Sequence, residues 1–186
     1  MKDLYKLDPV GCAILVVDIQ DRLMRVIDRG DALVKNAVLL LKTANVLKIP
    51  VLATTQYVER IGQLLPEITQ ELNKLTPLDK MEFDCLANGE IRAEIKKLPR
   101  TINTLIVCGV ETHICVYQTV VGSILAGYRV WVAADAVSSR TAENYLNGLA
   151  RIREIGGVVA STEMIIYDLL GKAGTPEFKA LLPSLK

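Results

Sequence analysis

The chain has 186 residues, of which 51% are hydrophobic, so we expect one domain with a buried core over residues 1–186. Its 22 lysines and arginines nearly balance its 21 aspartates and glutamates, and the net charge of +1 excludes strong electrostatic attraction to nucleic acid or an anionic membrane. The apolar runs are too short to span a bilayer and the charged N-terminus lacks the pattern of a secretory signal, so we expect a cytoplasmic protein whose partner is a small-molecule substrate.

Apolar runs alternate with helix-type periods, a pattern typical of a parallel sheet covered by helices on both faces. A continuous apolar run over residues 13–17 ends at Asp18 and predicts a central strand. A mostly apolar helical face over 34–47 leads through Pro50 to a second strand at 51–53, which completes a β-α-β unit. The stretch 56–79 is less regular and predicts a short helix over 66–72 followed by a turn.

The second half of the chain repeats the alternation more clearly. A helix is predicted over 91–98, a buried strand over 104–108, a turn over 109–113, and a helix from residue 114 that ends at Gly127. A strand over 129–133, a helix over 142–153, a strand over 157–160 and a helix over 162–170 follow, with a short helical tail after residue 176. The whole pattern predicts an α/β fold with three layers and a doubly wound, mainly parallel sheet of Rossmann-like type.

In such sheets, ligands bind beyond the carboxyl ends of the strands where the strand order reverses. This rule selects Asp18, which ends the first strand, and the segments 54–56, 109–115 and 135–140, which follow later strands. Among these residues, we expect Cys115 at a helix N-terminus. Free N–H groups there favour a thiolate, should lower the thiol pKa, and could stabilise an oxyanion. Asp18 is then the candidate base, and Lys80 would offset the repulsion between a carboxylate and a thiolate.

Each of these residues also has an ordinary structural interpretation. A free cysteine is commonly a buried hydrophobe, a strand-end aspartate often caps a turn, and a lone lysine is usually solvated. The other three cysteines lie at positions 12, 85 and 108, without C-x-x-C spacing, and we expect no disulfide. Only the ordered set of Asp18, Lys80 and Cys115 favours chemistry.

Three sequence blocks carry a family resemblance: Leu15-Val16-Val17-Asp18-Ile19-Gln20, Asp79-Lys80-Met81-Glu82-Phe83-Asp84, and Cys108 to Val116 with the sequence CGVETHICV. Together they resemble the isochorismatase-like cysteine hydrolases, and the blocks at 55–57, 135–140 and 174–179 make the chain most similar to the isochorismatase-domain-containing branch. The resemblance implies a six-stranded parallel sheet and a catalytic triad of Asp18, Lys80 and Cys115. It also implies a cis peptide bond between Val110 and Glu111 beside the oxyanion site.

Two departures from the family pattern narrow the prediction. Nicotinamidases of this family bind a metal through Asp-x-His-x-His after the second strand, whereas this chain has Gln56-Tyr57-Val58-Glu59-Arg60 there. With His113 as its single histidine the chain cannot build that site, so we expect no metal and no cofactor. Isochorismatases proper lack the nucleophilic cysteine, so Cys115 places this chain with the amidase-like members.

The sequence therefore predicts a hydrolase that attacks a small substrate, at an amide-type C–N bond, through a thioester on Cys115. Gln56, Tyr57, His113 and Arg140 are candidate substrate contacts, although a structural role for His113 is favoured because it lies only two residues before Cys115. We also expect a homo-oligomer, since the apolar run Met164-Ile165-Ile166 with Leu169 and Leu170 offers more apolar surface than one packing face needs. The alternatives are a thiol redox or sensor protein that uses Cys115, and a binding protein that keeps the fold without turnover.

Overall fold

The computed structural model describes residues 6–73 and 75–185. It contains a six-stranded sheet with all neighbouring strands parallel, in the order β3-β2-β1-β4-β5-β6. The order runs outward in both directions from the β1/β4 pair, so the predicted doubly wound sheet is confirmed. The strands are β1 (Cys12–Val17), β2 (Val51–Gln56), β3 (Leu78–Lys80), β4 (Thr104–Val110), β5 (Arg129–Ser138) and β6 (Val158–Ala160).

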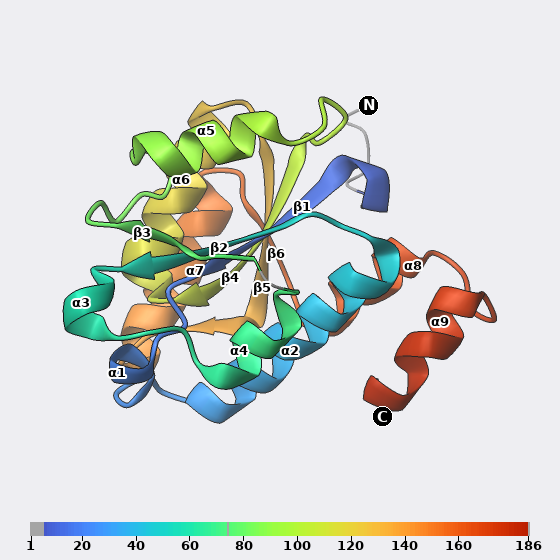
Figure 1. The fold of residues 1–186 in the computed structure, drawn as a ribbon, viewed down its shortest axis with the longest axis horizontal. Helices are drawn as coiled ribbons and strands as arrows, with labels where there is room; N and C mark the ends of the chain where they lie inside the picture. Colours follow the sequence, from blue (N-terminus) through green and yellow to red (C-terminus); the bar gives the residue numbers. More distant parts are fainter. Residues whose placement is uncertain (1–5, 74, 186) are drawn as a thin grey trace.

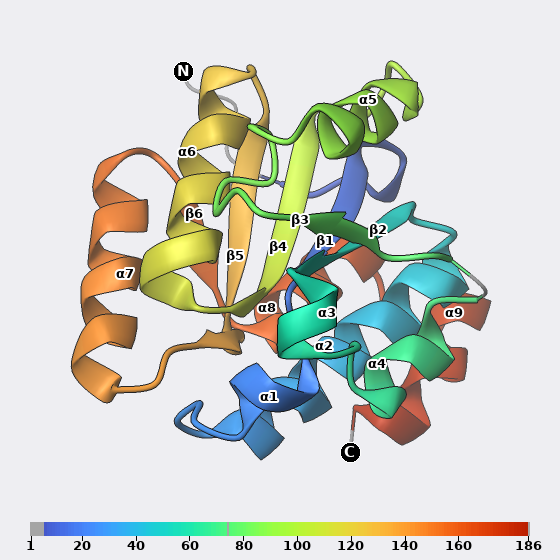
Figure 2. The same cartoon turned by 60° about the vertical axis from the view of Figure 1, so that its left-hand side comes forward.

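Helices cover both faces of this sheet (Figure 1). One face carries α2 (Gly30–Leu47), α4 (Pro66–Glu71) and α8 (Thr162–Leu170), and α9 (Pro176–Leu181) contacts α2 from outside. The other face carries α5 (Gly89–Lys97), α6 (Tyr117–Leu125) and α7 (Ala142–Glu154). Figure 2 shows α6 and α7 on one side of the strands and α2, α4 and α9 on the other. Two short helices, α1 (Asp21–Met24) and α3 (Val58–Ile61), follow β1 and β2, and single turns lie at η1 (Pro9–Gly11) and η3 (Leu182–Ser184).

The alternation of side chains along β1 explains the three layers. All six residues of β1 are buried, and successive side chains point to opposite faces of the sheet. Ile14 and Val16 pack against α2, α4 and α8, whereas Ala13, Leu15 and Val17 pack against α5, α6 and α7. A strand that is apolar at every position is therefore central and covered on both sides, as its sequence predicts.

The structure differs from the sequence-based expectation in the region before Lys80 and at the end of β5. Leu78–Lys80 forms the edge strand β3, which its mixed Leu-Asp-Lys sequence does not indicate. Strand β5 continues to Ser138 rather than ending near residue 133, because its far end pairs with Gly109 and Val110 after a shift in register. Both differences involve pairing partners that are distant in the sequence.

The switch point between β1 and β4 depends on a glycine. Gly109 has a φ of 122°, and a Cβ atom there would lie 1.9 Å from the carbonyl oxygen of Val17. Only glycine allows this backbone approach, which brings the ends of β1 and β4 together. Within the ranges 6–73 and 75–185, none of the helices is both long enough and apolar enough to cross a membrane.

Candidate active site

The structure brings Asp18, Lys80 and Cys115 together at the carboxyl ends of neighbouring strands. Asp18 follows β1 directly, and its predecessor Val17 pairs with Thr54 of β2 on one side and with Gly109 of β4 on the other. Lys80 ends β3 and pairs with Gln56. Cys115 lies in η2 (Thr112–Val116), a π-helical turn that leads into α6. The doubly wound order thus gathers residues from three separate parts of the chain.

Asp18 and Lys80 form a completely buried ion pair. The Nζ of Lys80 lies 2.6 Å from Oδ2 of Asp18, and the exposed fraction of both side chains is 0%. Both charges therefore lie in the packed interior of the protein. A buried ion pair needs further hydrogen bonds to compensate for lost hydration.

Thr54 and Gln56 supply those hydrogen bonds. The hydroxyl of Thr54 donates to Oδ1 of Asp18 at 2.7 Å, and Lys80 donates a second bond to Oε1 of Gln56 at 2.7 Å. The amide nitrogen of Gln56 donates to the carbonyl of Met81 at 2.9 Å, so both ends of this side chain are engaged inside the protein. Gln20, fully buried, accepts the backbone N–H of Gln56 at 2.7 Å and holds this strand end in turn.

The Cys115 thiol lies near the same carboxylate, whose charge acts on it. Burial raises its pKa to about 12, and the negative charge of Asp18 and a hydrogen bond to Asp18 add to the rise, whereas Lys80 opposes it. The expected lowering of this pKa at a helix N-terminus is therefore wrong, because desolvation and Asp18 outweigh the helix end and the lysine. In the resting site the thiol keeps its proton beside a carboxylate that can accept it.

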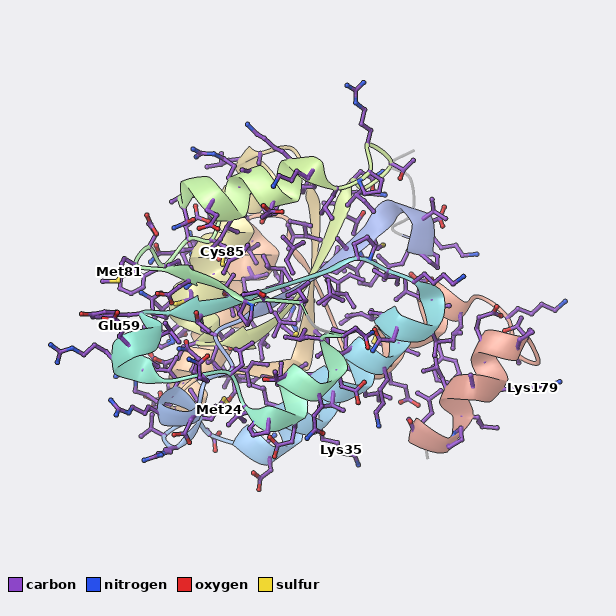
Figure 3. All side chains as sticks on the ribbon, viewed as in Figure 1. Met24, Lys35, Glu59, Met81, Cys85 and Lys179 are labelled. Atoms are coloured by element: carbon purple, nitrogen blue, oxygen red, sulfur yellow. The ribbon has the colours of Figure 1, made fainter. Side chains whose placement is uncertain are left out.

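The charge on Lys80 is stabilised by its surroundings. Burial alone would lower the pKa of its ammonium group, but the charge of Asp18 and smaller contributions from Cys85 and Cys115 raise it. The pair with Asp18 thus favours the charged form of Lys80. Cys85 is also fully buried beside the site, with its Sγ 3.9 Å from the hydroxyl of Thr54. Figure 3 shows Cys85 beneath α5 and Met81 at the outer edge of the molecule.

The segment before Cys115 is held from two sides. The peptide bond between Val110 and Glu111 is cis, and the backbone N–H groups of Ile114 and Val116 both donate to the carbonyl of Glu111, at 3.0 and 3.2 Å. Helix α7 packs directly on this turn at Gly148, where a Cβ atom would lie 2.9 Å from the carbonyl carbon of Thr112. The turn that carries the thiol is therefore closely packed against α7.

The other candidate substrate contacts, Tyr57, His113 and Arg140, are more exposed than the catalytic candidates. Tyr57 is half-buried at the end of β2, with a left-handed φ of 42°. His113 is half-buried, and its Nδ1 lies 3.0 Å from the hydroxyl of Ser139. Arg140 is exposed and forms an ion pair with Glu111 at 2.9 Å.

Comparison with known proteins decides the family. The model of the isochorismatase domain matches residues 12–164. The chain belongs to the isochorismatase family. The secreted isochorismatase effector Isc1 of Phytophthora sojae is 34% identical over 188 residues, covering all of this chain and 89% of that protein. Isochorismatase domain-containing protein 2B of mouse is 31% identical, covering 98% of this chain and 85% of its own length.

Solved structures of the family agree in fold. MAR1 ribonuclease of Caenorhabditis elegans superimposes with a TM-score of 0.89 at 27% identity, covering 97% of this chain and 92% of that one. YcaC of Pseudomonas aeruginosa, solved with hexane-2,5-diol and covalent acrylamide, gives a TM-score of 0.90 at 21% identity and covers 99% and 93%. The resemblance to the isochorismatase-domain-containing branch is thus confirmed, and membership in the family supports a hydrolase role.

Sequence reasoning gave no role to three side chains of this isochorismatase-family site. Thr54 and Gln20 hold Asp18 and Gln56, and Cys85 adds a second thiol. Thr54 had a detectable signal, since it lies one residue after the predicted strand at 51–53, and it pairs with Val17 in the sheet. Nothing in the local sequence of Gln20 or Cys85 indicates their long-range contacts.

Metal-ligand arrangement and cavity position are two further features that bear on the location of the site. In the described part of the chain, no group of three or more His, Cys, Asp and Glu side chains is arranged to hold a metal ion. A cavity of about 270 Å³ lies between α2, β5 and α7, and its lining includes Asp28, Arg29 and Tyr145 but none of the three candidate catalytic residues. We therefore place the candidate active site by its side-chain chemistry rather than by the size of a neighbouring cavity.

Proposed function

We propose that this protein is a cysteine-dependent hydrolase that cleaves an amide-type C–N bond in a small molecule. One observation carries the proposal: the fully buried ion pair of Asp18 and Lys80 lies close enough to the Cys115 thiol for both charges to act on its pKa. A base, a nucleophile and a fixed cation at one point support nucleophilic catalysis. The near-complete burial of Cys115, which is 6% exposed, favours a small substrate.

In the first half of the reaction, Asp18 accepts the thiol proton while the sulfur of Cys115 forms a bond to the carbonyl carbon. The negative charge passes to the carbonyl oxygen, which the backbone N–H groups of Glu111 and Cys115 would bind. The C–N bond then breaks, and protonated Asp18 returns the proton to the departing nitrogen. The product of this half is a thioester on Cys115 and a free amine.

In the second half, Asp18 takes a proton from a water molecule that attacks the thioester carbon. The C–S bond breaks, the acid leaves, and the sulfur recovers its proton from Asp18. Lys80 stays charged throughout and remains bonded to Asp18, so that the thiol rather than the lysine delivers the proton. The hydroxyl of Thr54 fixes the orientation of that carboxylate.

The two rival functions fit the geometry less well. A redox sensor needs an accessible thiol of low pKa, whereas Cys115 is buried and its pKa is raised. A binding protein without turnover would have no need of a buried ion pair beside a thiol, since replacing such a pair by apolar residues is often neutral or stabilising.

Turnover of a panel of small amides, nitriles and esters tests the proposal, with Cys115→Ser as the matched variant. The name of the C. elegans relative makes a short RNA a sensible addition to the panel. We expect amide turnover that is lost in Cys115→Ser. Turnover that survives in Cys115→Ser, or cleavage of RNA alone, would contradict the proposal.

We also propose that the protein forms a homo-oligomer, for which the octameric YcaC of Escherichia coli is a precedent in the same fold. The apolar residues of α8 do not carry this proposal as the sequence suggested, because Ile165, Ile166 and Leu169 are buried within the chain. Met164 is exposed. Light scattering at micromolar concentration should show a multiple of 20.4 kDa, and a monomer would refute it.

A further inference from the structure

Arg140 and Glu111 connect two segments that are far apart in the sequence. The carboxylate of Glu111 accepts three N–H groups of Arg140: Nη2 at 2.9 Å, Nε at 3.2 Å and the backbone nitrogen at 2.9 Å. A two-pronged arginine–carboxylate contact fixes orientation as well as distance. Glu111 begins the turn that carries Cys115, so Arg140 determines where that turn starts.

This ion pair is unlike the pairs on the helix surfaces. Those, such as Arg25 with Asp21, join residues three or four positions apart in one stretch of chain. Only 9% of the Glu111 side chain is exposed, against 56% for Arg140. A carboxylate that has lost most of its hydration needs a strong partner, and Arg140 reaches in from the solvent to provide it.

A second contact runs beside the first. Ser139, which is fully buried, places its hydroxyl 3.0 Å from Nδ1 of His113. The segment after β5 is itself fastened, because the backbone N–H of Asp28 donates to the carbonyl of Ser139 at 3.0 Å and Ser138 donates to the carbonyl of Asp28 at 2.6 Å. Ser139 and Arg140, which follow β5, therefore bind His113 and Glu111, the residues on either side of Thr112.

We infer that Arg140 is a positioning residue: through Glu111 it holds the turn that carries Cys115 so that the thiol meets Asp18. The inference rests on the proposed function, in which Cys115 is the nucleophile. It replaces the sequence-based expectation that Arg140 binds substrate, because two guanidinium nitrogens already bind Glu111. His113 holds the same turn through Ser139.

The test measures the second-order rate of Cys115 alkylation by neutral iodoacetamide and by anionic iodoacetate. In both reactions the sulfur bonds to carbon, iodide leaves, and the thiol proton passes to Asp18. The variants are Arg140→Ala, Arg140→Lys and the control Arg25→Ala, which removes an exposed arginine from a surface pair. Thermal melts verify that each variant is folded at the labelling temperature.

We expect Arg140→Ala to slow both reagents by the same factor, about 10- to 100-fold, since small displacements of a reacting group have effects of that size. Arg140→Lys should be intermediate because it keeps the charge without the two-pronged contact. Because the Arg140 side chain is 56% exposed, millimolar guanidinium chloride should enter the vacated place and restore much of the rate, whereas methylammonium chloride should not. Arg25→Ala should match the wild type.

Three results would overturn the inference. Loss of the iodoacetate rate alone would make Arg140 a binding residue for an anionic group. Unchanged rates with both reagents would leave Arg140 a surface pair without effect on the thiol, and failure of guanidinium to rescue folded Arg140→Ala would exclude positioning through the side chain. If wild-type Cys115 itself is not labelled, the proposed function fails instead, which peptide mapping distinguishes.

Discussion

Replacing Lys80 by methionine tests how much the buried ion pair contributes to the stability of the protein. The substitution keeps an unbranched side chain but leaves Asp18 as a buried carboxylate without its cation, 2.6 Å from where the ammonium was. Removing one partner of a buried pair typically costs about 3–5 kcal/mol, a large part of the roughly 5–15 kcal/mol that stabilises a protein. At about 2–4 °C per kcal/mol for a chain of this size, the melting temperature should fall by roughly 6–20 °C.

Urea and thermal unfolding of Lys80→Met, Asp18→Asn, their double variant and a surface control measure this effect. Lys97→Met is the matched control, because Lys97 pairs with Glu94 on the surface with 69% of its side chain exposed, and it should change stability by less than about 1 kcal/mol. The double variant Asp18→Asn/Lys80→Met should recover much of the stability lost by Lys80→Met, since no buried charge remains. Equal stability of Lys80→Met and Lys97→Met, or a double variant whose loss is the sum of the two single losses, would refute the reasoning.

Three other predictions follow from the described residues. Burial raises the pKa of each cysteine thiol from 9.0 to about 11 or 12. The unfolded state therefore loses these protons first, and the free energy of unfolding should fall as the pH rises above about 9. Urea unfolding at pH 8 to 10 measures this fall, and Cys108→Ala should make it less steep. Gly109→Ala should prevent folding, as judged by circular dichroism, because its Cβ would lie 1.9 Å from the carbonyl oxygen of Val17, and a folded variant of normal stability would contradict the close approach of β1 and β4. Exhaustive treatment with EDTA should leave amide turnover unchanged, and a loss that zinc or manganese restores would show a metal requirement.

The sequence was sufficient to predict the sheet because its periodicity is strong. The apolar run of β1 and the helical periods of α2 and α7 depend on local pattern, and each lies where the pattern placed it. Strand β3 was missed because Leu78-Asp79-Lys80 is an edge segment whose conformation is set by pairing with β2. The π-helical turn at Thr112–Val116 was predicted only as a turn and a helix start, since it depends on the packing of α7 at Gly148.

The candidate site was predictable in composition but not in environment. The strand-end rule and the family motifs select Asp18, Lys80 and Cys115, and the structure brings all three together. Their complete burial, and with it the raised thiol pKa, depends on contacts from several elements that no local pattern encodes. The environment of Gln56 was not predictable either. Its residue type suggested a substrate contact, whereas its side-chain amide is hydrogen-bonded to Lys80 and to the carbonyl of Met81.

Brief labelling with iodoacetamide near neutral pH, followed by peptide mapping, tests the central claim most directly. All four cysteines are buried and have raised pKa values, so preferential labelling of Cys115 would identify it as the activated thiol. We predict that Cys115 is modified well before the other three. Faster labelling of another cysteine, or no labelling of Cys115, would contradict the assignment of Cys115 as the nucleophile.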